Sequence, residues 1–197
     1  MNATAPDSGA PIVGILLAAG SATRFGGAKL QATLPDGTMV GVAALRNLLA
    51  AVDSVIAVVR PGDDTFANTL MAAGARVTVC PNAGNGMGAS LAWGVRAAPL
   101  AAGWLVALAD MPWIRPASIA NVVYALRRDV ALAAPQYQGA RGHPVGISAR
   151  FYAELRALQA DEGARHLIAA HAAVLELLAV DDAGVLRDVD TPADLLR

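Results

Sequence analysis

Short runs of apolar residues recur along the chain, and each has the length of a buried β-strand. The first run, Ile12–Ala18, is continuously apolar and ends in a turn of small residues, which is the pattern of a strand covered on both faces. Similar runs lie at Ser54–Arg60, Ala75–Cys80, Trp104–Ala109, Val130–Ala134 and Val145–Ser148. The pattern therefore predicts six strands.

Segments of helical length separate these runs. The predicted helices are Val40–Ala50, Asp64–Ala73, Gly88–Ala97, Pro116–Arg128, Ala149–Gln159, Gly163–His171 and Thr191–Leu196. Strands that alternate with helices favour right-handed crossovers, so we predict a single Rossmann-like α/β domain over residues 11–197, with a mostly parallel sheet flanked by helices. Residues 1–10 are predicted to form a disordered N-terminal tail. In such sheets, ligands bind beyond the carboxyl ends of the strands.

Composition narrows the class of protein. The 197-residue chain is 55% hydrophobic and only 16% charged, with a formal net charge of −1. These values exclude an intrinsically disordered chain and argue against a surface for nucleic acid or anionic membrane. The longest uncharged apolar run, Ala97–Ala109, is shorter than the roughly 20 residues of a membrane span. Residues 1–10 precede the first apolar run and contain Asp7 but no Lys or Arg, whereas a secretory signal begins with basic residues. Cys80 is the only cysteine, so the chain cannot form an internal disulfide. Both observations lead us to expect a cytoplasmic protein.

The first strand leads into a loop of small residues that carries two basic side chains. Residues 17–29 read Leu-Ala-Ala-Gly-Ser-Ala-Thr-Arg-Phe-Gly-Gly-Ala-Lys. Backbone N–H groups of such a loop can approach an anion, whose charge Arg24 and Lys29 would neutralise. The loop has neither the P-loop pattern nor the Gly-x-Gly-x-x-Gly dinucleotide pattern. By its motif alone, it is equally compatible with a flexible glycine loop whose basic residues are solvated.

Carboxylates follow the fourth apolar run and recur near the C-terminus. Asp110 comes directly after that run, so we expect its side chain at the carboxyl edge of the sheet, where a hard oxygen ligand suits Mg²⁺. The alternative is that Asp110 only caps the following turn. Asp188 and Asp190 offer a second carboxylate. Alternatively both are solvent-exposed, and Thr191 simply caps the final helix.

Two further segments combine glycine with polar side chains. Residues 82–90, Asn-Ala-Gly-Asn-Gly-Met-Gly-Ala-Ser, precede a predicted helix, and their glycines permit close contact with a nucleobase or ribose. The alternative is an ordinary helix-entry loop. His143 follows Arg141 and Gly142 at the start of a later strand, and it is as compatible with a hydrogen-bonded structural histidine as with a substrate contact. Cys80 ends an apolar run, which predicts a thiol in the core.

Taken in order, these segments resemble the nucleotidyltransferase family that includes sugar-phosphate and molybdenum-cofactor nucleotidyltransferases. The opening Leu-Ala-Ala-Gly-x-x-x-Arg-Phe-Gly-x-x-Lys looks like the signature of that family, and the resemblance extends from Ile12 to Leu196. Five further segments are similar to those of molybdenum cofactor cytidylyltransferases: residues 85–91, 110–112, 141–145, 161–165 and 188–195. One departure is Ala22, where relatives often carry glycine.

The resemblance implies a nucleotide-diphospho-sugar transferase-like fold and a role for each segment. It implies Arg24, Lys29 and Asp110 as catalytic residues and Mg²⁺ as the cofactor. The metal would be held by Asp110 and Asp190, with Asp188 as the substitute for the second ligand. The residues implied for the second substrate, a phosphate-bearing pterin, are Arg141, Gly142 and His143. The residues implied for nucleotide binding are Leu17, Ala18, Ala19, Gly20, Ser21, Arg24, Lys29, Asn85, Gly86, Gly88 and Ser90.

The activity implied by the resemblance is the transfer of CMP from CTP to the phosphate of a molybdopterin cofactor, with release of pyrophosphate. The alternatives are a guanylyl or sugar-phosphate nucleotidyltransferase, and a non-catalytic module that binds a nucleotide or cofactor. The expected partners are CTP, a molybdopterin-type cofactor and a molybdoenzyme or chaperone that receives the product. Neither a nucleic acid nor a membrane is expected as a partner. An attacking phosphate is already anionic, which is consistent with a sequence that shows no acid–base carboxylate pair.

Overall fold

All six predicted strands lie in one eight-stranded sheet in the computed structural model, which describes residues 9–20, 25, 27–159 and 163–196. The strands are β1 (Ile12–Leu17), β2 (Ser54–Val59), β3 (Arg76–Val79), β4 (Gly103–Leu108), β5 (Leu132–Tyr137), β6 (Ala140–Arg141), β7 (Val145–Ser148) and β8 (Leu175–Ala179). The sequence pattern did not predict β6 and β8. The predicted α/β class, with a mostly parallel sheet flanked by helices, is confirmed.

The sheet has the strand order β3-β2-β1-β4-β7-β5, with β6 forming a hairpin with β5 and β8 also pairing with β5. β1 pairs in parallel with both β2 and β4, so that Leu17 lies opposite Val58 on one side and Leu108 on the other. β7 is antiparallel to both of its neighbours. The carboxyl ends of β1, β2 and β4 therefore meet at one edge of the sheet.

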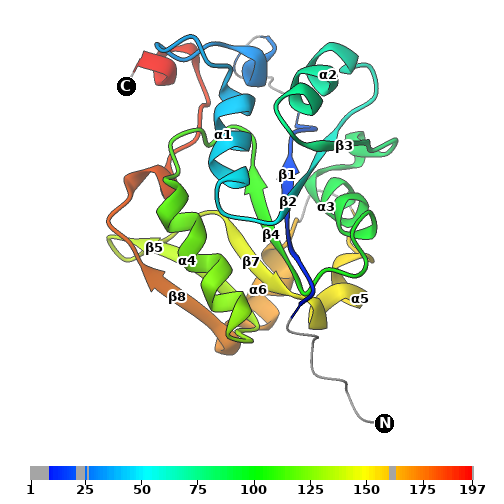
Figure 1. The fold of residues 1–197 in the computed structure, drawn as a ribbon, viewed down its shortest axis with the longest axis vertical. Helices are drawn as coiled ribbons and strands as arrows, with labels where there is room; N and C mark the ends of the chain where they lie inside the picture. The colour runs from blue at the N-terminus through cyan, green and yellow to red at the C-terminus, as the bar shows by residue number, and fades with distance from the viewer. Residues whose placement is uncertain (1–8, 21–24, 26, 160–162, 197) are drawn as a thin grey trace.

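Helices cover both faces of the sheet (Figure 1). They are α1 (Val40–Leu49), α2 (Asp64–Ala72), α3 (Met87–Arg96), α4 (Pro116–Arg127), α5 (Tyr152–Leu155) and α6 (Arg165–Ala170). Buried side chains of α1, α2 and α4 belong to one hydrophobic cluster, and those of α3, α5 and α6 belong to a second. In the described part of the chain, every helix is too short or too polar to span a membrane.

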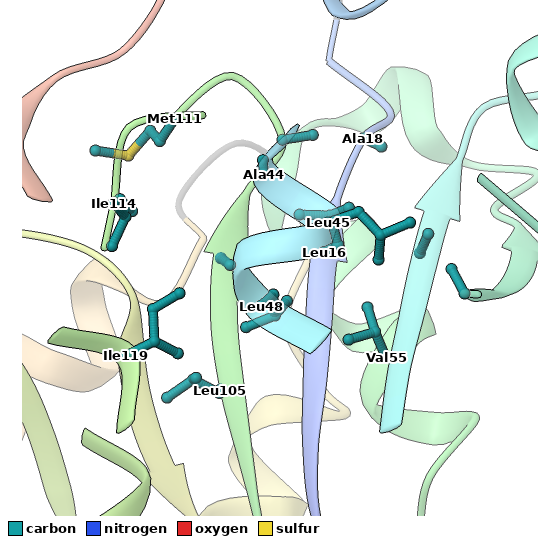
Figure 2. Packing of buried hydrophobic residues seen from close by; sticks show 14 of the residues in the cluster. Leu16, Ala18, Ala44, Leu45, Leu48, Val55, Leu105, Met111, Ile114 and Ile119 are labelled. Atoms are coloured by element: carbon teal, nitrogen blue, oxygen red, sulfur yellow. The ribbon is translucent and has the colours of Figure 1, made fainter. Parts of the chain in front are cut away.

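Side chains of β1 alternate between the two hydrophobic clusters. Leu16 belongs to the first cluster and Ile15 to the second, and neither is exposed to solvent. Figure 2 shows Leu45 and Leu48 of α1 packed over Leu16. Gly14 makes this close approach possible, because a Cβ at that position would lie 2.9 Å from Leu48 Cδ2. Burial of each leucine contributes about 1.5–3 kcal/mol, so this packing fixes the strand from which the first loop emerges.

The chain after β7 differs from the sequence-based prediction. The predicted helix Ala149–Gln159 is a short 3-10 turn followed by the four-residue α5, and the predicted final helix is a 3-10 helix, Pro192–Leu196. Leu175–Ala179 form β8 because all five residues pair in parallel with residues of β5. Arg141 was expected to open the later strand, but it lies in the separate hairpin strand β6. Among these segments, β8 owes its structure to backbone pairing with a strand that is distant in the sequence.

Candidate functional site

A cleft opens at the edge of the sheet where β1, β2 and β4 end. Its larger part has a volume of about 580 Å³, and it adjoins a smaller part of about 150 Å³. Four residues line both parts: Leu17, Gly20, Arg60 and Asp110. The larger part is within the range of about 300–1,000 Å³ that is typical of small-molecule sites. The cleft also lies where open α/β sheets bind their ligands.

Lys29 connects the two carboxylates that the sequence suggested as metal ligands. It begins a 3-10 helix, Lys29–Gln31, in the segment after β1. Its Nζ lies 2.7 Å from Asp110 Oδ2 and 3.8 Å from Asp190 Oδ1. The Lys29 and Asp110 side chains are only 14% and 23% exposed, whereas that of Asp190 is 47% exposed. Three residues from distant parts of the sequence thus form one mostly buried, charged cluster.

The C-terminal segment brings Asp190 to this cluster. The N–H of Val189 donates a hydrogen bond to the Asp110 carbonyl oxygen at 2.9 Å. The Arg187 guanidinium lies over the Trp113 ring, 3.6 Å from its centroid. Figure 1 shows this end of the chain at the top of the view, near the segment that follows β1. The segment is therefore fixed against the loop that carries Asp110.

Asp182 anchors the start of the same segment. Asp182 is 3% exposed, and its carboxylate accepts hydrogen bonds from the Arg115 N–H at 2.9 Å, the Ser118 hydroxyl at 2.7 Å and the Gly184 N–H at 3.0 Å. Gly184 packs against the Trp113 backbone so closely that a Cβ would overlap with its carbonyl group. Hydrogen bonds to a buried carboxylate are among the stronger ones in proteins, so Asp182 holds the segment in place.

The carboxylates form an oxygen-rich corner that fits a divalent cation. Asp110 Oδ1 is buried and has no hydrogen-bond partner within the described residues, which is costly unless a ligand satisfies it. Burial raises the pKa of Asp188, and the negative charges of Asp190 and Asp110 raise it further. Within the described ranges, no group of three or more His, Cys, Asp or Glu residues could hold a metal by itself. Such a sparse donor set suits Mg²⁺, which takes one or two carboxylates and completes its shell with water and phosphate.

Most of the residues expected to bind a nucleotide line the cleft. They are Leu17, Ala18, Ala19, Gly20, Lys29, Asn85, Gly86 and Ser90. Gly86 has a φ of 116°, which favours glycine, and it lets the chain turn into α3. Gly88 is buried in the first turn of α3 and does not line the cleft. Ser21 and Arg24 lie outside the described residues.

The Arg141–His143 segment packs against the C-terminal segment. Arg141 is exposed on β6, whereas Gly142 is buried so close to Val185 that a Cβ would lie 2.5 Å from the Val185 carbonyl oxygen. The N–H of His143 donates to that oxygen at 2.9 Å. Burial lowers the pKa of the His143 imidazole to about 4, the Arg141 charge acts in the same direction, and Asp110 opposes it. His143 is therefore neutral at physiological pH, and its buried Nδ1 has no hydrogen-bond partner among the described residues.

The low pKa of His143 predicts a loss of stability in mild acid. The imidazole takes up a proton near pH 6.5 in the unfolded chain but only near pH 4 in the folded one. The free energy of unfolding therefore falls as the pH drops from about 6.5 toward 4, and by pH 5 this group has removed about 2 kcal/mol. Urea unfolding at pH 8 and at pH 5 measures how much unfolding free energy is lost between the two pH values. That loss should be about 2 kcal/mol larger in the wild type than in His143→Gln. Equal losses in the two proteins would contradict the prediction.

Two charged residues of the cleft, Arg60 and Asp63, were not predicted from the sequence. Arg60 directly follows β2 and lines both parts of the cleft, and Asp63 lines the smaller part. Arg60 Nε donates to Asp63 Oδ2 at 2.9 Å. The signal was available, because Arg60 ends an apolar run just as Asp110 follows one.

Comparison with known proteins identifies the family. Residues 14–174 match the MobA-like NTP transferase domain. The chain belongs to the MobA-like NTP transferase family. The expectation of a nucleotidyltransferase is thereby confirmed, and a nucleoside triphosphate substrate follows from the family.

Proteins of known name or structure resemble the chain over nearly its full length. Purine catabolism protein PucB of Bacillus subtilis is 32% identical over an alignment of 201 positions, gaps included, that covers 93% of each protein. The crystal structure of Rv0371c from Mycobacterium tuberculosis H37Rv has 28% sequence identity and a TM-score of 0.80, covering 95% of this chain and 97% of that one. A second Rv0371c structure, a complex with manganese, has 28% identity and a TM-score of 0.76, covering 93% and 95% of the two chains.

A more distant structure establishes how widely the fold is shared. The 4-diphosphocytidyl-2C-methyl-D-erythritol synthase from Anaerococcus prevotii is only 14% identical, yet it has a TM-score of 0.74 and covers 93% of this chain and 92% of its own. At that identity the likeness concerns the fold alone. The predicted nucleotide-diphospho-sugar transferase-like fold is confirmed for this MobA-like NTP transferase.

Proposed function

We propose that this NTP transferase moves CMP from CTP to the phosphate of a molybdopterin cofactor and releases pyrophosphate. The observation that carries the proposal is the cluster in which Lys29 Nζ lies 2.7 Å from Asp110 and 3.8 Å from Asp190, beside a cavity of about 580 Å³. The choice of CTP and a pterin acceptor rests on the segments Leu-Ala-Ala-Gly, Gly-Met-Gly-Ala-Ser and Arg-Gly-His-Pro, which resemble those of cytidylyltransferases.

The proposed reaction exchanges one bond to phosphorus for another. An oxygen of the acceptor phosphate forms a bond to the α-phosphorus of CTP, the bond from that phosphorus to the α–β bridging oxygen breaks, and pyrophosphate leaves with the electron pair. The attacking phosphate is already anionic at neutral pH, so no general base is needed. Catalysis then comes from positioning the two substrates and from stabilising the charge that develops on the phosphates.

The cleft residues supply this positioning. Lys29 lines the smaller cavity, and its ammonium group would hold phosphate oxygens there. Asp110 and Asp190 would hold Mg²⁺, and the unsatisfied Oδ1 of Asp110 is the oxygen that fits it best. When bound, Mg²⁺ neutralises phosphate charge and aligns the triphosphate. The manganese complex of Rv0371c supports a divalent ion. Ser21 and Arg24 remain predicted contacts of the triphosphate.

The remaining residues divide between the two substrates. Ala19, Gly86 and Ser90 line the larger part of the cleft, where they would surround the nucleoside, and Ala18 lines the adjoining smaller part. Residues 141–143 would face the phosphate-bearing pterin. Exposed Arg141 offers a charged donor for the acceptor phosphate, and neutral His143 would contact the pterin without adding a second charge.

A pyrophosphate-release assay with four triphosphates tests the proposal. CTP, GTP, UTP and ATP are each incubated with Mg²⁺ and enzyme, with and without the molybdenum cofactor. We expect release with CTP that depends on the cofactor and exceeds release with the other three. Faster release with GTP would make the protein a guanylyltransferase. Release that depends on a sugar phosphate instead of the cofactor would overturn the acceptor, and tight CTP binding without release would indicate a non-catalytic module.

A further inference from the structure

Arg60 lines the cleft but has no role in the proposed reaction as described above. The strand order β3-β2-β1-β4 places the carboxyl ends of these parallel strands in a row. Asp110 follows β4 and Arg60 follows β2, on opposite sides of β1. Because neighbouring strands are about 4.8 Å apart, the ends of β2 and β4 are separated by roughly 10 Å. Arg60 lines both parts of the cleft, and in the larger part it shares the wall with the loop that leads into α3.

The larger part of the cleft is the part with room for a nucleoside. It has about 580 Å³, against about 150 Å³ for the smaller part that Lys29 lines. Asn85 and Ser90 line the larger part, and Lys29 does not. Arg60 is the only basic side chain on its wall among the described residues. If the triphosphate lies toward Lys29, the base lies in the larger part and within reach of Arg60.

One ion pair, with Asp63, positions the Arg60 guanidinium. Nε donates to Asp63 Oδ2 at 2.9 Å, and the two Nη groups have no hydrogen-bond partner among the described residues. Asp63 balances the charge of Arg60, which weakens its attraction for a polyphosphate. The pair of parallel N–H donors at the Nη end keeps its directional preference for two adjacent acceptors.

We propose that Arg60 reads the nucleobase by donating two hydrogen bonds to adjacent acceptors on one edge of the base. This inference rests on the proposed function. Cytosine presents N3 beside O2, and guanine presents O6 beside N7. In adenine the amino donor separates N1 from N7, and in uracil the N3–H separates O2 from O4, so neither base offers two adjacent acceptors to the fork. Arg60 therefore selects cytosine or guanine against adenine and uracil, and Asp63 acts as the positioning residue that aims it.

Arg60→Lys separates base reading from phosphate binding, because lysine keeps the charge and loses the paired donors. Kd values for CTP, GTP, UTP and ATP, each with Mg²⁺ and without acceptor, can be measured by calorimetry. In Arg60→Lys we expect the Kd of the preferred triphosphate, CTP or GTP, to rise about tenfold. The Kd values of UTP and ATP should change less than about twofold. Asp63→Ala should produce the same selective loss, but a smaller one.

The matched control is Arg76→Lys. Arg76 is exposed at the amino end of β3, on the opposite edge of the sheet, and its substitution should leave all four Kd values unchanged. Unchanged selectivity in Arg60→Lys would overturn the inference while leaving the proposed function intact. An equal loss in Arg60→Ala for all four triphosphates would also overturn it, because that result identifies a phosphate contact. A wild-type protein that releases pyrophosphate from none of them would overturn the proposed function itself.

Discussion

Replacing Asp110 with asparagine is expected to lower kcat/KM for pyrophosphate release about a hundredfold, which is roughly 2.7 kcal/mol of transition-state stabilisation. Asparagine has nearly the same shape but no negative charge. It would remove the negative charge that pairs with Lys29 at 2.7 Å, and its neutral amide oxygen is a weaker ligand for a divalent cation than the carboxylate whose buried Oδ1 fits the metal. The Asp110 carbonyl group keeps its hydrogen bond from Val189, so the loop should stay in place.

Two further variants test whether the loss of activity in Asp110→Asn comes from the charged cluster. Asp36→Asn is the matched control, because Asp36 is exposed in a turn and its Oδ1 accepts a hydrogen bond that asparagine can also accept. Its activity should equal that of the wild type. Lys29→Ala should lower kcat/KM at least tenfold, since the phosphates lose a fixed positive charge. Near-wild-type turnover of Asp110→Asn with saturating Mg²⁺ would rule out the assigned role of Asp110.

Replacing Asp182 with alanine is expected to lower the free energy of unfolding by about 3–5 kcal/mol. The change leaves three donors without their acceptor in a buried place, namely the N–H of Arg115, the Ser118 hydroxyl and the N–H of Gly184. It also loosens the segment that carries Asp190, so activity should fall at temperatures where the variant is still folded. Urea unfolding gives the first quantity, and pyrophosphate release gives the second.

Asp181 supplies the control for this prediction. Its side chain is exposed, and the Arg115 guanidinium contacts only its backbone carbonyl oxygen, which alanine keeps. Asp181→Ala should change the free energy of unfolding by less than about 0.5 kcal/mol. If the two variants were equally stable, the hydrogen bonds of Asp182 would not anchor the C-terminal segment.

The central strands were predictable from the sequence for a physical reason. β1, β2 and β4 are covered on both faces, so each is a continuous apolar run that ends where the chain reaches solvent. Leu175–Ala179 carries no such signal, because its side chains are only partly buried and its leucines also favour helices. Its pairing with β5 makes it a strand. That pairing depends on the whole fold and is invisible in the local pattern.

The candidate site divides in the same way. Lys29 and Asp110 were found because each follows an apolar strand within a recognisable motif, and the adjacency of β1 and β4 explains their 2.7 Å contact. Asp182 belongs to no recognisable motif. Its role as an anchor comes from three hydrogen bonds, two from residues that are distant in the sequence and one from Gly184 in the adjacent turn. Arg60 followed a strand but matched no family segment. Sequence patterns therefore reveal strand ends and motifs, whereas hydrogen-bonded supports require the structure.

Tracing the α-phosphate of CTP tests the proposed activity most directly. The enzyme is incubated with Mg²⁺, molybdenum cofactor and CTP that is labelled at either the α- or the γ-phosphate. We expect the α-label in the cofactor product and the γ-label in pyrophosphate, with one pyrophosphate released for each cofactor modified. Transfer of the γ-label to the cofactor, or release of inorganic phosphate in place of pyrophosphate, would contradict nucleotidyl transfer to this acceptor.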